Sequence, residues 1–379
     1  MYSVYQHWDP LQTCVVGRSY PPEFYSWISV AHVRNLFERI AIETEEDYQN
    51  IIRKLESFGV TVLRPQLPKQ VVMENQRYLP PPMTPRDNMV MIGTTLYQSY
   101  SFDLKHAYNN VRDAAWPEFV DDPGFFKSLP STIQDECANI HNFSYHQDML
   151  CAYDHIYDHV RQQGNVVKNH FYDGEIINGA MVSRMGHDLY FGTLSYDQDP
   201  VKLKQDLDKE FSQYQVHVVN TGGHGDGTYC PVAPGLIISL QDVPSYRDTF
   251  PGWEVVYLPN QSYKLIQEFT QLKERNRGRW WIPGFEHDTA VTDVVEAWLG
   301  HWTGYVEETV FDVNMLVVDP KNVIVFNYNK QVFDALDRYG ITPHIVPFRH
   351  RYFWDGGIHC VTADLHREGT MQDFFSNRL

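Results

Sequence analysis

Short apolar runs alternate with helix-like segments along the chain. The first run, residues 13–16, is followed by a segment in which Thr44 can cap a helix and apolar residues recur every three or four positions up to Leu55. Gly59 then ends the helical pattern, and residues 60–63 form a second apolar run. This pattern predicts a strand, a helix from Thr44 to Leu55 and a second strand.

The same unit recurs in altered form along the rest of the chain. Its later copies open with two apolar runs, which are joined at a glycine in three of the four, and most of them continue through a helix into a further run. The five copies begin near residues 13, 89, 181, 232 and 315. No copy of this ββαβ-like unit can bury its own sheet face, so the repetition predicts a closed ring within one domain that spans residues 1–379. The expected fold class is therefore α/β.

Two segments do not fit the repeat. Residues from about 100 to 169 are polar and aromatic, and they contain a helical pattern over residues 148–161. The second segment, residues 291–302, places valine, leucine and tryptophan along one stripe, which is typical of a packing face. We expect both segments to be helical insertions that cover or wall the ring.

Charge and composition narrow the choice of partners. The formal net charge of −17 disfavours nucleic acid and anionic membranes, because both require a basic surface, but it is compatible with a cationic substrate. No apolar run reaches the length of a membrane span, and the five cysteines are scattered and lack CxxC spacing. We expect a cytoplasmic protein with no nucleic-acid or membrane partner and no disulfide framework. A homodimer is compatible with the sequence.

Two local patterns carry chemistry. Cys360 follows Gly356 and Gly357, where the backbone can turn sharply, so it is a candidate nucleophile, although a buried cysteine more often acts as a small apolar side chain. His155 and His159 are four positions apart on a helical pattern, a spacing that can bind zinc, but no third ligand follows and surface histidines explain them more simply. We therefore expect no metal site.

Polar residues at the strand starts are more informative. Asp87 precedes the second copy of the repeat, and His224 and Asp226 precede the fourth. In a ring, equivalent strand starts meet at the axis, so these residues and Cys360 are expected to lie together. Each could alone be a turn former, a loop histidine or a cap. Together they supply a nucleophile, an acid/base and two carboxylates that suit a planar guanidinium. His359 is expected to point to the opposite side of an extended strand.

Six short motifs follow one another along the chain. They are Pro85-Arg86-Asp87, His224-Gly225-Asp226, Asn314-Met315-Leu316, Arg349-His350, Gly356-Gly357-Ile358-His359-Cys360 and Gly369-Thr370-Met371-Gln372. They resemble the motifs of the glycine amidinotransferase family, within the guanidino-group-modifying pentein superfamily. The resemblance covers nearly the whole chain and implies a five-bladed α/β propeller, which agrees with the predicted ring of repeats.

The resemblance implies a ping-pong amidinotransferase that needs no cofactor. Cys360 would attack the guanidinium carbon of L-arginine, His224 would protonate the departing ornithine amine, and Asp87 and Asp226 would hold the guanidinium. A small amine acceptor, deprotonated by the same histidine, would then take the amidino group. Asn314, in its own matching motif, is expected among the substrate-binding residues.

The chain departs from the family pattern around the histidine. The carboxylate that orients this histidine in the family falls on Asn178, with Glu175 nearby as a substitute. An amide can orient an imidazole but cannot stabilise its positive charge. The residues just ahead of the histidine, which touch the acceptor in the family, are Thr221, Gly222 and Gly223 here. A serine of the family falls on Asp312, which is expected among the substrate-binding residues.

The residues that recognise the donor also depart from the family pattern. The sequence leaves the identity of the acceptor open. The arginine that binds the donor carboxylate falls on Val243, with Arg247 as the nearest replacement. The leading hypothesis is transfer to an amine other than, or in addition to, glycine. Water as the acceptor would make the protein a hydrolase of the deiminase or dihydrolase kind, and the missing carboxylate also allows a non-catalytic binding propeller.

Overall fold

The fold is described from a computed structural model of the chain. It covers residues 1–67, 80–98, 152–169, 171–172, 175–176, 179–193, 199–240, 246–258, 282, 284–285, 287–299, 312–354 and 356–375. No helix in these ranges is long and apolar enough to cross a membrane.

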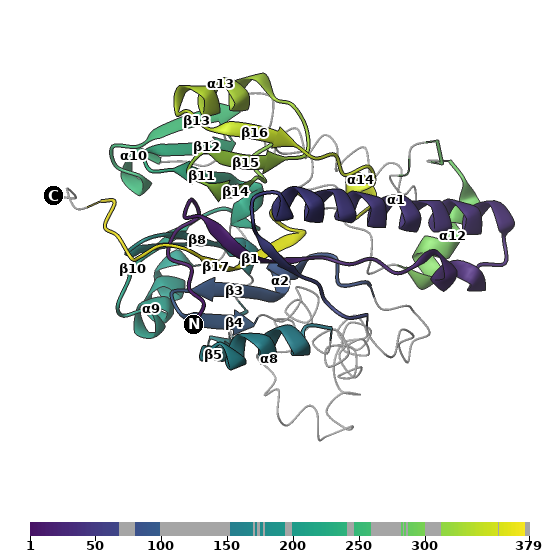
Figure 1. Cartoon of the computed structure of the whole chain (residues 1–379), viewed down its shortest axis with the longest axis horizontal. Helices are drawn as coiled ribbons and strands as arrows, with labels where there is room; N and C mark the ends of the chain where they lie inside the picture. The colour runs from purple at the N-terminus through teal and green to yellow at the C-terminus, as the bar shows by residue number, and fades with distance from the viewer. Residues whose placement is uncertain are drawn as a thin grey trace.

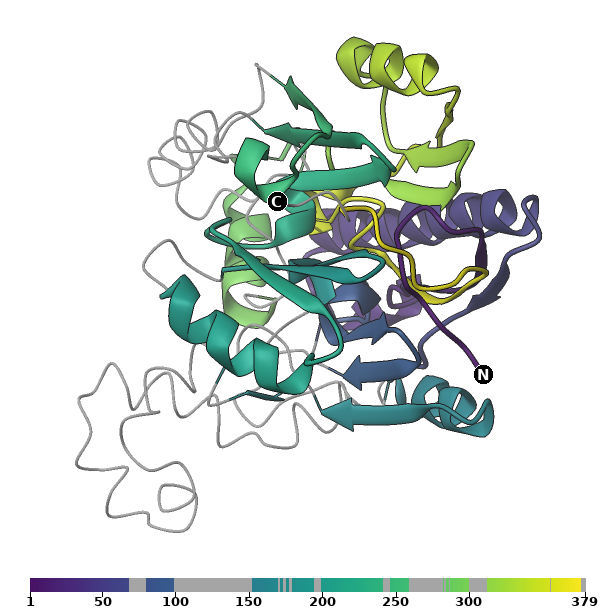
Figure 2. The same cartoon turned by 90° about the vertical axis from the view of Figure 1, so that its left-hand side faces the viewer.

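Five three-stranded sheets form the body of the molecule (Figures 1 and 2). In each sheet the first strand runs antiparallel to the second, which runs parallel to the third. The sheets, in that strand order, are β17 (Thr362–Arg367), β1 (Leu11–Val16) and β2 (Thr61–Leu63); β3 (Met89–Ile92), β4 (Thr95–Gln98) and β5 (Val166–Asn169); β8 (Val182–Met185), β9 (Asp188–Gly192) and β10 (Gln215–Val219); β11 (Tyr229–Ala233), β12 (Leu236–Leu240) and β13 (Glu254–Leu258); and β14 (Leu316–Asp319), β15 (Asn322–Val325) and β16 (Thr342–Ile345). The predicted ring of five ββαβ units is confirmed.

Helices join the second and third strands and lie towards the outside of the molecule (Figure 1). They are α1 (Ala31–Glu56), α8 (Asp154–Gln162), α9 (Pro200–Glu210), α10 (Tyr246–Thr249) and α13 (Lys330–Arg338). Gly59 and Gly340 follow two of these helices with φ of 81° and 68°. Glycine adopts this left-handed conformation without strain, which explains why it marks the helix ends of the repeat.

The remaining elements lie outside these strands and helices. They are η1 (Pro22–Trp27), α2 (Pro85–Asn88), β6 (Phe171–Tyr172), β7 (Glu175–Ile176), η2 (Gly179–Met181), η3 (Gly225–Gly227), α12 (Thr289–Trp298) and α14 (Arg351–Trp354). Three of them, α2, η2 and η3, directly precede first strands. They therefore place their side chains where the sheets begin.

The two ends of the chain close the ring. β1 pairs with β17 from Leu11 opposite Arg367 to Val16 opposite Thr362, and the two strands lie side by side in Figure 1. The first copy of the repeat thus lacks a first strand of its own, and the strand that follows Cys360 supplies it. The nucleophile candidate therefore lies beside the seam of the ring.

α1 begins earlier than predicted. It starts at Ala31 and not at Thr44, and its N-terminal half buries Phe37 and Ile40 in the core. Thr44 is buried inside the helix, where its Oγ1 lies 2.9 Å from the indole N–H of Trp354. Packing of an apolar face, rather than a cap, therefore decides where this helix begins.

The expected insertion over residues 100–169 is shorter at its C-terminal end. α8 and β5 belong to the second sheet, in which β5 pairs with β4. Residues 99–151, including the start of the helix predicted over residues 148–161, lie outside the described residues. α12 has the packing face that the sequence predicted, since Val291, Val295 and Leu299 are buried in the same core cluster as α1.

One buried carboxylate and three guanidiniums form a cluster that links the first strands. Asp364 in β17 pairs with Arg86 at 2.6 Å, Arg184 at 2.8 Å and Arg367 at 2.7 Å, and all four side chains are buried. Burial alone would raise the pKa of Asp364, but the three guanidiniums outweigh it and hold that pKa well below its ordinary value. Burial lowers the pKa of Arg184 to about 10, so Arg184 stays charged at neutral pH.

The guanidiniums also donate to backbone carbonyls of other strands. Arg184 donates to Met91 O in β3 at 2.7 Å, Arg367 donates to Val317 O in β14 at 2.8 Å, and the Arg86 Nε–H donates to Thr362 O at 3.1 Å. The cluster therefore connects four of the five first strands through hydrogen bonds to charged donors, which are stronger than neutral ones.

Replacing Asp364 by Asn should strongly destabilise the fold. The variant leaves three buried guanidiniums without their counter-charge, so we expect the free energy of unfolding to fall by about 3–5 kcal/mol. Urea titration measures the loss. Asp334→Asn is the control, because its ion pair with Lys330 is exposed and should contribute less than about 1 kcal/mol. Equal losses in the two variants would contradict the role of the cluster.

The contribution of Asp364 to the free energy of unfolding should also depend on pH. Its folded-state pKa is depressed, so its stabilising effect is present above the ordinary pKa of 3.8 and is lost as the pH falls towards the folded-state value. The stability difference between wild type and Asp364→Asn should stay constant from about pH 8 to about pH 5 and narrow below about pH 4. Urea titrations across this range measure it, and a gap that widens in acid would refute the assignment.

Candidate active site

The starts of the first strands meet at one end of the ring. α2 carries Asp87 and leads into β3, η3 carries Asp226 and leads into β11, and Cys360 lies just before β17. The backbone N–H of Arg86 donates to the carbonyl of Cys360 at 3.4 Å. The structure therefore brings together segments that are far apart in the sequence, as the repeat predicted.

Cys360 is almost fully buried, with 2% of its surface exposed. Its Sγ lies 3.5 Å from Asp226 Oδ2 and 3.0 Å from Asn314 Nδ2. A planar amidinium whose N–H groups bind this carboxylate would have its carbon close to the sulphur. The arrangement is therefore suited to attack of the thiol on a carbon of the amidino type.

Asn314 holds the turn that carries the thiol. Its Oδ1 accepts the backbone N–H of His359 at 2.8 Å and that of Cys360 at 3.4 Å. Its Nδ2 donates to Cys360 Sγ and, at 3.4 Å, to the Asp226 carbonyl. The resemblance implied a substrate-binding residue here, and these contacts show that Asn314 also positions the thiol.

His224 and Asp87 form a more open part of the site. His224 Nδ1 lies 3.9 Å from Asp87 Oδ1, and the two side chains are 17% and 23% exposed. The His224 carbonyl accepts the Thr228 hydroxyl at 3.2 Å, which ties the loop to the start of β11. Because solvent reaches this pair and not Cys360, its position suits proton exchange with an arriving or departing amine.

His359 does not point away from the site, contrary to the prediction. It lies in the turn before β17, so the alternation of an extended strand does not apply to it. Its Nδ1 lies 2.7 Å from Asp226 Oδ2. Burial lowers the pKa of His359 well below its ordinary value, and the nearby Arg86 and His7 shift it in the same direction. The imidazole is therefore neutral at physiological pH.

The loop ahead of His224 is held by its own hydrogen bonds. The Thr221 hydroxyl is buried and lies 2.6 Å from the Gly223 carbonyl and 3.2 Å from the Thr193 carbonyl. The resemblance implied that Thr221 and Gly223 touch the acceptor. In the structure both shape the loop that presents His224.

Asp312 belongs to a polar group close to Asn314 in the chain. Its carboxylate accepts from the side-chain amides of Asn327 and, at 2.7 Å, Asn329. Arg351 donates to Asn327 Oδ1 at 2.6 Å. The expected substrate-binding residue Asp312 is thus a carboxylate held at two points.

The remaining predicted positions lie elsewhere. Arg247 is in α10 and is exposed. Asn178, predicted to orient His224, lies outside the described residues, as does Val243. Glu175 lies in β7, but its side chain is also outside the described part of the chain.

Two other thiols, those of Cys14 and Cys230, are also buried. Burial raises the pKa of Cys14 to about 12, and burial together with the nearby Asp226 does the same for Cys230. Both are therefore protonated at neutral pH and poor nucleophiles.

The histidines considered for zinc contact different groups. His155 Nε2 lies 2.9 Å from the Arg64 carbonyl, and His159 Nε2 lies 2.9 Å from the Tyr2 hydroxyl. Across the described ranges, no group of three His, Cys, Asp or Glu residues could hold a metal ion.

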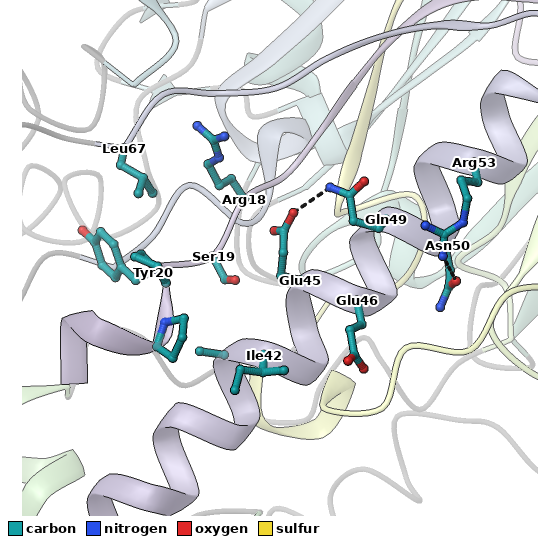
Figure 3. A pocket seen from close by; sticks show the side chains of 13 residues that line it. Arg18, Ser19, Tyr20, Ile42, Glu45, Glu46, Gln49, Asn50, Arg53 and Leu67 are labelled. Atoms are coloured by element: carbon teal, nitrogen blue, oxygen red, sulfur yellow. Dashed lines mark hydrogen bonds between the residues drawn. The ribbon is translucent and has the colours of Figure 1, made fainter. Parts of the chain in front are cut away.

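A pocket of about 820 Å³, which no motif predicted, opens beside α1 (Figure 3). Its lining includes Arg18, which follows the end of β1 by two residues, and Leu67. Its carboxylates Glu45 and Glu46 each pair with an arginine, at 2.6 and 2.7 Å. These carboxylates therefore already have their counter-charges.

Comparison with known proteins agrees with this geometry. No protein-family model matches the chain. The chain is 23% identical to the mitochondrial glycine amidinotransferase of Xenopus laevis over 98% of this chain and 84% of that protein. It is 22% identical to inosamine-phosphate amidinotransferase 1 of Streptomyces glaucescens over 98% of both proteins.

Solved structures show the same fold. The inosamine-phosphate amidinotransferase of Streptomyces griseus matches with a TM-score of 0.61 at 16% identity, over 99% of both chains. An amidinotransferase of saxitoxin biosynthesis from Microseira wollei matches with a TM-score of 0.60 at 16% identity, also over 99% of both. The chain is therefore similar to amidinotransferases along nearly its whole length, and it shares the fold of these two solved amidinotransferase structures.

Proposed function

We propose that the protein transfers the amidino group of L-arginine to a small amine through an amidino-cysteine at Cys360 and releases ornithine. The observation that carries this proposal is the 3.5 Å contact between Cys360 Sγ and Asp226 Oδ2, at the end of the ring that also holds Asp87 and His224. Arginine is the proposed donor because its side chain ends in a planar guanidinium that two carboxylates can hold.

In the first half-reaction, Cys360 acts as a thiolate after its proton has passed to His224. Asp87 and Asp226 bind the N–H groups of the guanidinium, so that its carbon faces the sulphur. The sulphur forms a bond with this carbon, His224 returns the proton to the departing nitrogen, and the carbon–nitrogen bond breaks. Ornithine leaves, and the amidino group remains on the sulphur.

In the second half-reaction, an amine takes the place of ornithine. The neutral His224 accepts a proton from the acceptor, whose nitrogen forms a bond with the amidino carbon. The carbon–sulphur bond then breaks and the thiolate is restored. The carboxylates hold the same planar cation throughout, so both halves can use one set of contacts.

The acceptor side of the site favours an amine other than glycine. Asp312 stands where the resemblance implies a serine, and an ionised carboxylate accepts hydrogen bonds but cannot donate one. It therefore cannot donate to the carboxylate of glycine, and it would repel that group. A small amine without a carboxylate at this point fits better.

Incubation with L-arginine alone should give one equivalent of ornithine and then stop. Intact-protein and peptide mass spectrometry should find one added amidino group on Cys360, and a screen of amines should then release it as a guanidino product. Cys360→Ser should lower turnover by at least about 1,000-fold, because the hydroxyl is a far weaker nucleophile. Cys14→Ala is the control and should keep the adduct.

Two other outcomes would change the assignment. Continuous release of ornithine with urea, or of citrulline with ammonia, in the absence of any amine would make water the acceptor and the protein a hydrolase. Absence of a Cys360 adduct with arginine, while a thiol reagent modifies Cys230, would favour a non-catalytic protein.

The two glycines ahead of the thiol should differ sharply when replaced by alanine. Neither has a positive φ, but a Cβ on Gly357 would lie 2.1 Å from Asn314 Oδ1, whereas the nearest atom to a Cβ on Gly356 is Val361 Cγ1 at 3.4 Å. Gly357→Ala should displace Asn314 and slow adduct formation by about 100-fold. Gly356→Ala is the matched control and should stay within about threefold of wild type.

The measurement is the single-turnover rate of ornithine release, with the melting temperature of each variant recorded beside it. Equal rates in the two variants, with Gly357→Ala folded, would show that Asn314 does not position the nucleophile.

A further inference from the structure

His359 shares a carboxylate oxygen with the nucleophile. Asp226 Oδ2 lies 2.7 Å from His359 Nδ1 and 3.5 Å from Cys360 Sγ. The imidazole and the carboxylate are both buried, at 8% and 7% side-chain exposure. A single oxygen thus connects the histidine to the thiol.

The geometry allows the imidazole to donate this hydrogen bond. An ionised Asp226 carboxylate only accepts, and His359 Nδ1–H is then the donor of the short contact. The ring is neutral because burial lowers the pKa of His359 well below its ordinary value, helped by Arg86, His7 and Arg184 and opposed by Asp364. The bond therefore persists without a change of charge across the physiological range of pH.

The side chain and the backbone of His359 have separate tasks. The backbone N–H donates to Asn314 Oδ1 at 2.8 Å and holds the turn, which any residue other than proline could do at this position. The ring contacts Asp226 through Nδ1 and packs near His7, with ring centroids 5.8 Å apart. A change of the side chain can therefore remove the contact with Asp226 while the turn keeps its backbone bond.

We propose that His359 is a positioning residue that fixes the Asp226 carboxylate in the orientation in which it holds the amidino group against Cys360 Sγ. This inference rests on the proposed function. It adds a second histidine to the site, one that moves no proton. Without its N–H donor, Asp226 can rotate about its side-chain bonds, and the amidinium loses a fixed partner beside the sulphur.

Two near-isosteric variants separate the donor from the space that the side chain fills. His359→Asn can place a side-chain N–H where Nδ1 lies, whereas His359→Leu has similar size and no donor. His359→Phe keeps a ring without a donor and replaces the leucine variant if that one does not fold. Melting temperature and circular dichroism identify which variants are folded.

Two electrophiles read the position of Asp226 without turnover. Chloroacetamidine and chloroacetamide both alkylate a thiolate, with formation of a carbon–sulphur bond and loss of chloride. Only the amidine carries the planar cation that Asp226 would hold. The ratio of their second-order rate constants at Cys360, measured by peptide mass spectrometry, therefore reports the carboxylate and cancels general changes in thiol reactivity.

We expect the wild-type protein to react faster with chloroacetamidine than with chloroacetamide. His359→Leu should lower the ratio of the two rate constants by about 10- to 100-fold, the effect of losing one hydrogen bond to a charged group. The rate constant for chloroacetamide should change little. His359→Asn should recover most of the ratio. Asp226→Asn should abolish it, and adding His359→Leu to that variant should then change nothing further.

The failures are distinguishable. If wild type favours the amidine and a folded His359→Leu keeps the wild-type ratio, the positioning role is wrong and the proposed function stands. If the leucine variant loses both rates equally, the ring supports the turn as a whole, and the positioning role is again wrong. If wild type itself shows no preference for the amidine, the proposed function fails and the inference fails with it.

Discussion

The ring depends on a single buried carboxylate, Asp364, and on the three guanidiniums that surround it. Burying four charges would be prohibitive if any of them lacked partners, since the cost of removing each ion from water is several kcal/mol. Here the guanidiniums also donate to carbonyls of β3, β14 and β17, so the side chains that pair with Asp364 also link the strand backbones. The cluster therefore sets how the sheets meet.

The cluster also sets the electrostatics of the site. It carries an excess of positive charge, and Arg184 and Arg86 are the leading charged groups that lower the pKa of His7 and of His359, after burial itself. Both imidazoles stay neutral as a result. Arg86 also connects the cluster to the candidate site. Its backbone N–H donates to the Cys360 carbonyl, and the next residue in the chain is Asp87. The interactions that close the ring therefore also help to position Cys360, the candidate nucleophile.

The sequence could predict the features that follow from local pattern. Apolar runs and helix-ending glycines predicted the five units. Because strand starts meet at the axis of a closed ring, the sequence also predicted that Asp226 lies near Cys360. Features that depend on distant packing were out of reach. Thr44 was predicted to be a helix cap. The sequence around it could not show that it is buried against Trp354, which lies 310 residues further along the chain. His359 looked like a strand residue because nothing local marks β17 as beginning at Thr362.

The site has a fixed half and an open half, and this division bears on specificity. Cys360, Asn314, Asp226 and His359 are buried and held by one another, so they suit the amidino group, which is the same for every acceptor. His224 and Asp87 are reached by solvent, on the side where the proposed acceptor would arrive. Relatives of nearly equal similarity are named for glycine and for inosamine phosphate, so overall similarity does not fix the acceptor. The acceptor is therefore best sought among amines whose other groups suit Asp312 and the rim of the open half, while the buried half constrains only the group that is transferred.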